Sequence, residues 1–270
     1  MIGKPAEEPA QRRSERRTSV AALTDIGPRE VNEDRMFTAL ADDGVWVIAV
    51  ADGLGGHERG DEAAQAAVEG LPERIESDAD MAVAFAEANE RVVGVSGFSR
   101  TQRLRVPVRE IPMSTLCVAA WTPEGGLIIG WMGDTIPFVV RSGPDGFTGY
   151  CCGLPHRDLF GSITACLGML PEDDGFGDGF LEPDMVGGFE DSEMPDAVII
   201  ASDGAWEPFP KADRKAGWLW DDSPDGIGSA CAPDADDASD IARSVLAGAR
   251  SLVLHDNATV SVAYRPRSDR

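Results

Sequence analysis

The sequence is poor in the side chains that most often bind soft metals or act as nucleophiles. It has three histidines and five cysteines in 270 residues, and no two cysteines have Cys-x-x-Cys spacing. This odd, unpatterned set predicts neither a disulfide framework nor a zinc site, and it favours a reducing compartment. Because no cysteine or serine lies in a recognisable nucleophile signature, we expect no covalent enzyme intermediate.

Long apolar runs and an excess of basic residues are also missing. No run approaches the roughly 18 apolar residues of a membrane span, and no apolar core follows a charged start, so we expect neither an anchor nor a secretion signal. Lys and Arg total 24 against 47 Asp and Glu, a formal net charge of −23. Such a field repels nucleic acid and anionic membranes. We therefore expect neither nucleic acid nor a membrane as a partner. Because heptad repeats are absent as well, we expect a cytoplasmic monomer.

The chain divides into a short tail and one long domain. Residues 1–17 combine prolines and charged side chains without periodicity, which predicts a flexible tail. Residues 18–270 show no internal repeat and no shift of composition, so we expect a single domain.

Apolar spacing within this domain predicts three helices and a hairpin. One stripe runs from Ala64 to Ile75, a second from Met81 to Val92 and a third from Ile241 to Leu252. Residues 115–121 and 127–132 bracket a five-residue turn and read as a β-hairpin. Residues 94–112 read as a loop, and 162–168 as a helical turn or a short helix.

Four aspartates lie at the ends of short apolar runs. Asp52 follows the run 47–51, Asp203 follows 198–201, Asp134 follows the run 127–132 and Asp256 precedes 259–264. Each pattern is typical of a buried strand that delivers one carboxylate to its exposed end. A single Asp-Gly is more often an ordinary turn, so the inference rests on the combination.

Carboxylates on converging strand ends favour a hard divalent cation. Mg²⁺ and Mn²⁺ prefer carboxylate, carbonyl and water ligands. Two such ions sharing one aspartate activate a bridging water and neutralise a phosphate oxyanion. Arg29 precedes Glu33 and Asp34 by a few residues, and it would supply a planar fork for the phosphate. The residues therefore indicate metal-dependent hydrolysis of a phosphate ester.

The combination resembles the metal-dependent serine/threonine protein phosphatases of type 2C, in their bacterial form. The matching blocks follow the family order from residue 24 to residue 260: Thr24-Asp25-Ile26-Gly27, Asn32-Glu33-Asp34, Ala51-Asp52-Gly53-Leu54-Gly55-Gly56-His57, Ser114-Thr115-Leu116, Gly133-Asp134-Thr135, Ile163-Thr164, Leu167-Gly168, Ser202-Asp203-Gly204 and Asp256-Asn257-Ala258-Thr259-Val260. Each block is weak alone, but their order over nearly the whole chain is highly specific.

The resemblance implies an α+β fold, a four-layer sandwich of two antiparallel β-sheets flanked by α-helices. It also implies two Mn²⁺ or Mg²⁺ ions and a place for a third. Asp52 would bridge the central ions, Gly53 and Glu33 would serve one of them, and Asp203 and Asp256 the other. Asp34 would hold or deprotonate the attacking water, and Arg29 would bind the substrate phosphate. Asp134 would hold the third ion with Asp203, helped by Asp173, and residues 153–195 resemble a mobile flap.

Two departures from the family pattern stand out. Leu54 lies where eukaryotic relatives carry a histidine proposed as a general acid, and the nearby His57 does not inherit that role. After Asp134 the chain reads Thr135-Ile136-Pro137, without the usual arginine, which affects the expected third-metal neighbourhood more than the central pair.

The resemblance implies a phosphorylated protein as the substrate, made by a serine/threonine kinase. The sequence also leaves two other functions open. One is a phosphatase-like regulatory or binding module without turnover, and the other is a hydrolase of small phosphate esters.

Overall fold

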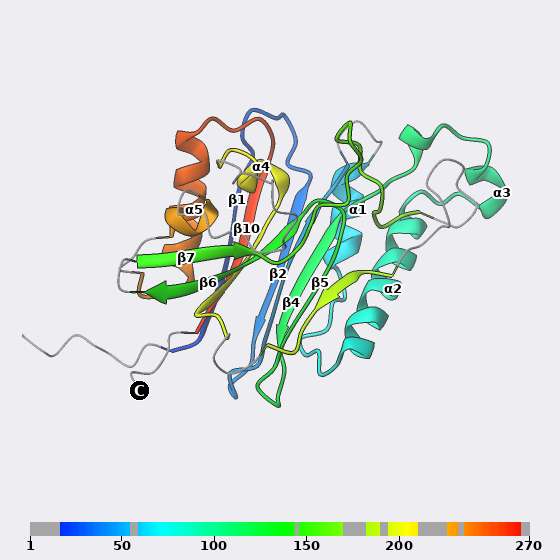
Figure 1. Ribbon diagram of the computed structural model, residues 1–270. Helices are drawn as coiled ribbons and strands as arrows, with labels where there is room; N and C mark the ends of the chain where they lie inside the picture. The colour runs from blue at the N-terminus through cyan, green and yellow to red at the C-terminus, as the bar shows by residue number, and fades with distance from the viewer. Residues whose placement is uncertain are drawn as a thin grey trace, which may run out of the picture.

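The computed structural model describes residues 17–54, 59–143, 146–169, 182–189, 194–209, 226–231 and 235–265. They form two antiparallel five-stranded sheets (Figure 1). The first sheet has the order β1 (Ser19–Asp25), β10 (Ala258–Tyr264), β9 (Ala197–Ala201), β6 (Ile136–Gly143) and β7 (Gly146–Cys151). The second has the order β2 (Asp34–Leu40), β3 (Trp46–Asp52), β4 (Leu116–Trp121), β5 (Leu127–Met132) and β8 (Asp184–Val186).

Helices cover the outer face of each sheet. In Figure 1, α5 (Ala238–Ser251) lies on one side of the two sheets, and α1 (Gly60–Val68) and α2 (Asp78–Val95) lie on the other. The fold is therefore the predicted α+β sandwich of four layers. The side chain of Ser77 accepts a hydrogen bond from the third residue of α2, and Asp237 does the same for α5. These N-caps satisfy amide groups that the first helical turn leaves unpaired.

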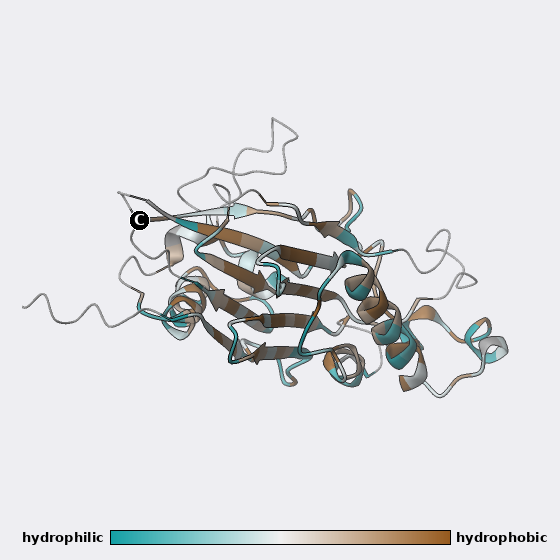
Figure 2. Cartoon of the chain, turned by 90° about the horizontal axis from the view of Figure 1, so that it is seen from below, coloured by the Kyte–Doolittle hydropathy of each residue, from teal (hydrophilic) through white to brown (hydrophobic). Residues whose placement is uncertain are grey.

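The continuous apolar run of β3 follows from burial on both faces. Trp46, Ile48 and Val50 face the core between the sheets, whereas Val47 and Ala49 pack under α1 and α2. Successive side chains of a strand point to opposite faces, so a strand in an inner layer has to be apolar at nearly every position. Figure 2 shows the same hydrophobic colour along the strands of both sheets.

Several local predictions need correction. The first helix ends at Val68, because Gly70 adopts a φ of +73° and Pro72 follows. Leu71 and Ile75 are nonetheless buried against the same cluster. The loop at 94–112 contains two short helical turns, α3 (Arg100–Arg103) and a 3₁₀ turn at Val108–Glu110.

Residues 162–168 do not form the predicted helical turn. Ile163 and Leu167 instead make isolated antiparallel bridges, to Arg157 and Ser114 respectively. The short strands β7 and β8 were not predicted. Two further short turns complete the described elements, α4 (Asp203–Trp206) and a 3₁₀ turn at Ile227–Ala230. None of the helices in the described ranges is long and apolar enough to cross a bilayer.

Antiparallel pairing brings the functional strand ends to one end of the sandwich. Asp34 opens β2 directly opposite Asp52, the last residue of β3. In the other sheet, the pairing of β10 with β9 sets Val260 beside Ala201, so the residues before β10 and after β9 emerge together. Carboxylates far apart in the sequence therefore meet at one edge.

Candidate active site

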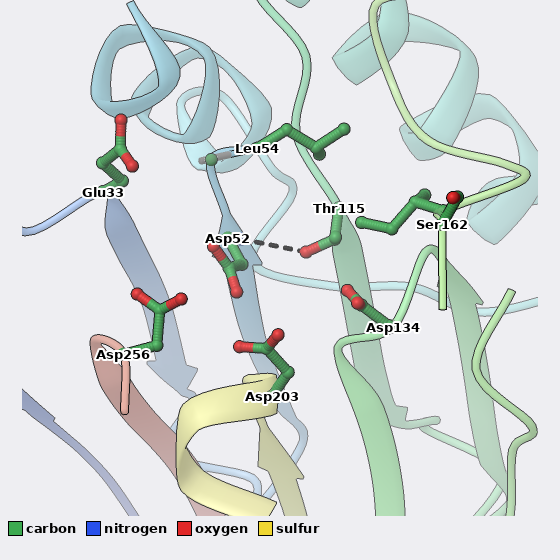
Figure 3. Close-up of a pocket in the computed structure, with 10 residues that line it drawn as sticks. Glu33, Asp52, Leu54, Thr115, Asp134, Ser162, Asp203 and Asp256 are labelled. Carbon is green, nitrogen blue, oxygen red and sulfur yellow. Dashed lines mark hydrogen bonds between the residues drawn. The ribbon is translucent and has the colours of Figure 1, made fainter. Parts of the chain in front are cut away.

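A pocket of about 310 Å³ opens where these strand ends meet. Its lining combines five carboxylates with a few small and apolar groups: Glu33, Asp52, Gly53, Leu54, Thr115, Asp134, Ser162, Ile163, Asp203 and Asp256. In the close-up, the carboxylates of Asp52, Asp203 and Asp256 face a common space (Figure 3). The structure thus brings together every predicted metal ligand in the described part of the chain.

The backbone around Asp52 is fixed by the start of β4. The amide of Asp52 donates to Thr115 Oγ1 over 3.0 Å, as the dashed line in Figure 3 shows, and the amide of Thr115 donates to Asp52 O over 2.8 Å. Ser114 Oγ donates to the same carbonyl over 3.0 Å. These contacts hold the end of β3 through the backbone of Asp52, so its carboxylate is not used for this purpose.

Asn257 ties the loop that carries Glu33 to the start of β10. Its Nδ2 donates to the carbonyl oxygens of Ile26 and Val31, and its Oδ1 accepts from the Glu33 amide over 2.8 Å. A single side chain therefore fixes both ends of this loop. The motif Asp256-Asn257 could have indicated this, because asparagine offers both a donor and an acceptor.

The N-terminus of α1 packs directly on the turn after β3. A Cβ on Gly53 would lie 2.2 Å from Gly60 O, and a Cβ on Gly60 would lie 2.7 Å from Glu33 Oε1. Only glycine fits at position 53, because a Cβ there would clash with backbone atoms, whereas a Cβ at position 60 would displace the Glu33 side chain. The close approach places the Glu33 carboxylate beside the helix N-terminus, where the helix dipole favours a negative charge.

Asp34 is the most enclosed of the predicted catalytic residues, with 3% of its surface exposed. Its Oδ2 accepts a hydrogen bond from Ser202 Oγ over 2.9 Å, and its Oδ1 is buried without a partner among the described residues. Burial raises the pKa of Asp34 to about 6, although the Ser202 hydroxyl opposes the shift. The group is thus poised to exchange a proton near neutral pH.

Burial and mutual repulsion raise the pKa values of three neighbouring carboxyl groups. Burial raises the pKa of Asp52 well above its ordinary value, and Asp34 and Asp203 add to the shift. Burial and the charge of Asp134 raise the pKa of Asp203 to about 7. Burial also raises the pKa of Asp134, against the opposing charge of Arg157. Such a cluster needs positive charge to stay ionised.

Two arginines supply part of that charge. Arg29 Nη2 donates to Asp256 Oδ2 at the mouth of the pocket. Arg157 donates from Nε to Asp134 Oδ2 over 2.6 Å and from Nη2 to Asp203 Oδ2 over 2.7 Å. Arg157 was not predicted, because no local sequence pattern links it to these partners.

The central residues fit a pair of hard divalent cations. Glu33, Asp52, Asp203 and Asp256 offer only oxygen donors, which Mg²⁺ and Mn²⁺ prefer. Asp203 Oδ1 is buried and has no hydrogen-bond partner among the described residues. Over the same residues, no three His, Cys, Asp or Glu side chains already stand close enough to form a ready-made centre. An ion would therefore have to draw the carboxylates together.

The family model described as Protein phosphatase 2C matches residues 26–221, more than half of the chain. The chain belongs to this family. Family membership makes it a protein serine/threonine phosphatase, in agreement with the resemblance carried by the sequence blocks. Among curated proteins, none matches this phosphatase.

Solved structures of bacterial phosphatases share the fold. Serine/threonine phosphatase Stp1 from Staphylococcus aureus has a TM-score of 0.68 at 16% identity, with 99% of this chain and 100% of that chain covered. PstP/Ppp from Mycobacterium tuberculosis has a TM-score of 0.65 at 19% identity, with 93% and 99% covered. MsPP from Mycobacterium smegmatis, solved with cacodylate, has a TM-score of 0.62 at 24% identity, with 92% and 98% covered.

Of the residues that depart from the family pattern, Leu54 lies in the described part of the phosphatase and His57 does not. Leu54 lines the pocket where eukaryotic relatives carry the histidine. His57 and Asp173 lie outside the described residues, as do residues 1–16 of the predicted tail and part of the predicted flap at 153–195. Those predictions therefore stay predictions.

Proposed function

We propose that the phosphatase hydrolyses phosphoserine and phosphothreonine monoesters in proteins, and that it depends on two Mn²⁺ or Mg²⁺ ions. The observation that carries this proposal is the convergence of Glu33, Asp52, Asp203 and Asp256 in one pocket. Four carboxylates without a bound cation would repel one another, and burial together with this repulsion raises the pKa values of Asp52 and Asp203. Two divalent ions would neutralise that repulsion.

The residues divide into ligands for the two ions. Asp52 lies in the middle of the cluster and would bridge them. Glu33 and the Gly53 backbone would serve one ion, and Asp203 and Asp256 the other. When bound, the ions would activate a water molecule and neutralise the charge that develops on the phosphate.

Arg29 would act on the substrate directly, and Asp34 would act on the attacking water. Water attacks phosphorus, the bond from phosphorus to the serine or threonine oxygen breaks, this oxygen takes up a proton from solvent, and inorganic phosphate leaves. Asp34 would orient the water and accept its proton, a role that its pKa of about 6 suits. The Arg29 side chain is 44% exposed at the pocket mouth. Its planar fork would bind phosphate oxygens with the donors that Asp256 does not use.

The proposed substrate is a protein that a serine/threonine kinase has phosphorylated. The pocket volume of about 310 Å³ can take a phosphorylated side chain presented by another protein. All five cysteines are free thiols, which supports the proposed cytoplasmic location. We propose a monomer as the working form.

The first test is phosphate release from a phosphothreonine peptide with Mn²⁺, with Mg²⁺ and with a chelator. We expect turnover with either ion, none with the chelator, and a loss of at least about 100-fold in Asp52→Asn. Asp42→Asn is a matched control, because it makes the same change on an exposed turn away from the pocket.

Two results would move the proposal to one of the alternatives. A folded wild-type protein that binds Mn²⁺ but shows no turnover on any phosphopeptide would indicate a regulatory module. Faster hydrolysis of a small aryl phosphate than of the phosphopeptide, judged by kcat/KM, would indicate a hydrolase of small phosphate esters.

A further inference from the structure

The segment Leu154–Arg157 is fastened to the turn that carries Asp134. The amide of His156 donates to Gly133 O over 2.9 Å, and the amide of Gly133 donates to His156 Nδ1 over 3.1 Å. Trp131 Nε1 donates to Leu154 O over 3.0 Å, and its ring stacks on the imidazole of His156. These contacts fix the backbone from which the Arg157 side chain extends.

Arg157 reaches three carboxylates from this fixed backbone. Its Nε donates to Asp134 Oδ2 over 2.6 Å, its Nη2 donates to Asp203 Oδ2 over 2.7 Å, and its Nη1 pairs with Glu207. The guanidinium carbon also lies 5.9 Å from the ring centroid of Trp206, within cation–π range. Only 21% of the Arg157 side chain is exposed, so solvent screens these pairs little.

The ion pair with Arg157 gives the two carboxylate oxygens of Asp203 different environments. Oδ2 accepts from Arg157, whereas Oδ1 is buried and has no hydrogen-bond partner among the described residues. Asp203 lines the pocket, so one oxygen stays available to the proposed central ions. Asp134, in contrast, has its Oδ2 taken by two guanidinium nitrogens.

We propose that Arg157 is a tethered cation that takes the place of a third metal ion between Asp134 and Asp203. The proposal rests on the proposed function, because that function supplies the two central ions. The side of the pocket at Asp134 therefore does not fit the metal that the family resemblance implies. A guanidinium is always charged and forks between two carboxylates, so it balances their charge without an ion from solution. Arg157 is then a positioning residue for Asp203, not a residue that contacts the substrate.

The test counts Mn²⁺ ions per chain by equilibrium dialysis, without any assay of turnover. We expect about two ions in the wild type and about three in Arg157→Ala, because the freed Asp134 and Asp203 then offer carboxylates to an ion. The added ion should disappear when Asp134→Ala is combined with Arg157→Ala. Arg157→Lys keeps the charge and should bind no added ion, and Arg243→Ala removes an arginine from a remote exposed pair with Asp240 and should match the wild type.

The outcomes separate this inference from the proposed function. An equal number of ions in Arg157→Ala and the wild type, with both folded by circular dichroism, overturns the role of Arg157. So does a wild-type ion that is lost in Asp134→Ala alone. If Arg157→Ala does not fold, Arg157→Gln gives the same comparison with a longer polar side chain. A wild type that binds no ions contradicts the proposed metal dependence, whereas the difference between the variants still decides the role of Arg157.

Discussion

Replacing Asp34 by asparagine should stabilise the metal-free phosphatase at neutral pH, although the same change removes the proposed base. Burial raises the pKa of Asp34 from 3.8 to about 6 in the folded protein. A shift of about two units corresponds to about 3 kcal/mol of unfavourable free energy for the ionised, folded form. Asparagine has the same shape without the charge, and its side-chain oxygen can still accept from Ser202 Oγ.

The sign of the pH dependence follows from the raised pKa. Below pH 3.8 Asp34 is protonated in both the folded and the unfolded chain, so folding does not bury an ionised carboxylate. As the pH rises through the folded pKa, the wild type loses this contribution to its free energy of unfolding. The advantage of Asp34→Asn should therefore grow between about pH 4 and pH 6 and stay constant above about pH 7.

Urea unfolding with a chelator present, followed by tryptophan fluorescence, measures this difference at several pH values. A gain of about 3 kcal/mol would raise Tm by about 6–12 °C in a domain of this size. Asp25→Asn is the control of opposite sign, because Arg250 lowers the pKa of Asp25. Its stability should fall slightly at pH 8, because the Arg250 side chain is 63% exposed and solvent screens the pair, and it should converge with that of the wild type in acid.

An Asp34→Asn protein that is less stable than the wild type at pH 8, or a difference that does not change with pH, would refute the reasoning.

Three further predictions concern the architecture of the pocket. Gly53→Ala should lower the free energy of unfolding by about 1–3 kcal/mol, because its Cβ would lie 2.2 Å from Gly60 O; an unchanged urea midpoint would contradict this packing. Thr115→Val should cost about 2 kcal/mol, since it removes the acceptor of the Asp52 amide and the hydroxyl 2.6 Å from Thr135 Oγ1; calorimetry should show the lowered Tm, and Thr115→Ser should restore it. Mn²⁺ at 100 times Kd should raise the wild-type Tm by about 5–10 °C. This rise should be lost in Asp52→Asn but kept in the control variant Asp42→Asn.

Sequence patterns predicted the strand ends well, because their cause is local. The run before Asp52 is apolar at every position since β3 is buried on both faces, and such a run ending in Asp-Gly is visible in the sequence. The run before Asp203 carries the same signal. The patterns alone did not show that these strand ends lie in two antiparallel sheets. The family resemblance implied the two sheets, and the structure confirms them.

The errors arose where distant contacts override local preference. Leu71 and Ile75 continue the apolar spacing of α1 but are buried outside it, because the chain turns at Gly70. Residues 162–168 resemble a helical turn, yet bridges to Ser114 and Arg157 hold them extended. Arg157 was missed since its partners lie 23, 46 and 50 residues away along the chain, and a lone arginine in a glycine-rich stretch carries no signal of that pairing.

The pairing of β1 with β10 has a consequence for synthesis. β1 lies at the edge of its sheet, and its neighbour there is β10, the last strand in the described residues, paired from Ser19 with Tyr264 to Asp25 with Ala258. Asn257, which fixes the Glu33 loop, belongs to the same late segment. A nascent chain therefore cannot complete the pocket until β10 has left the ribosome, and proteins fold from the N-terminus as they emerge. The unfinished protein thus has no working site with which to remove phosphate, and translation itself delays the onset of activity.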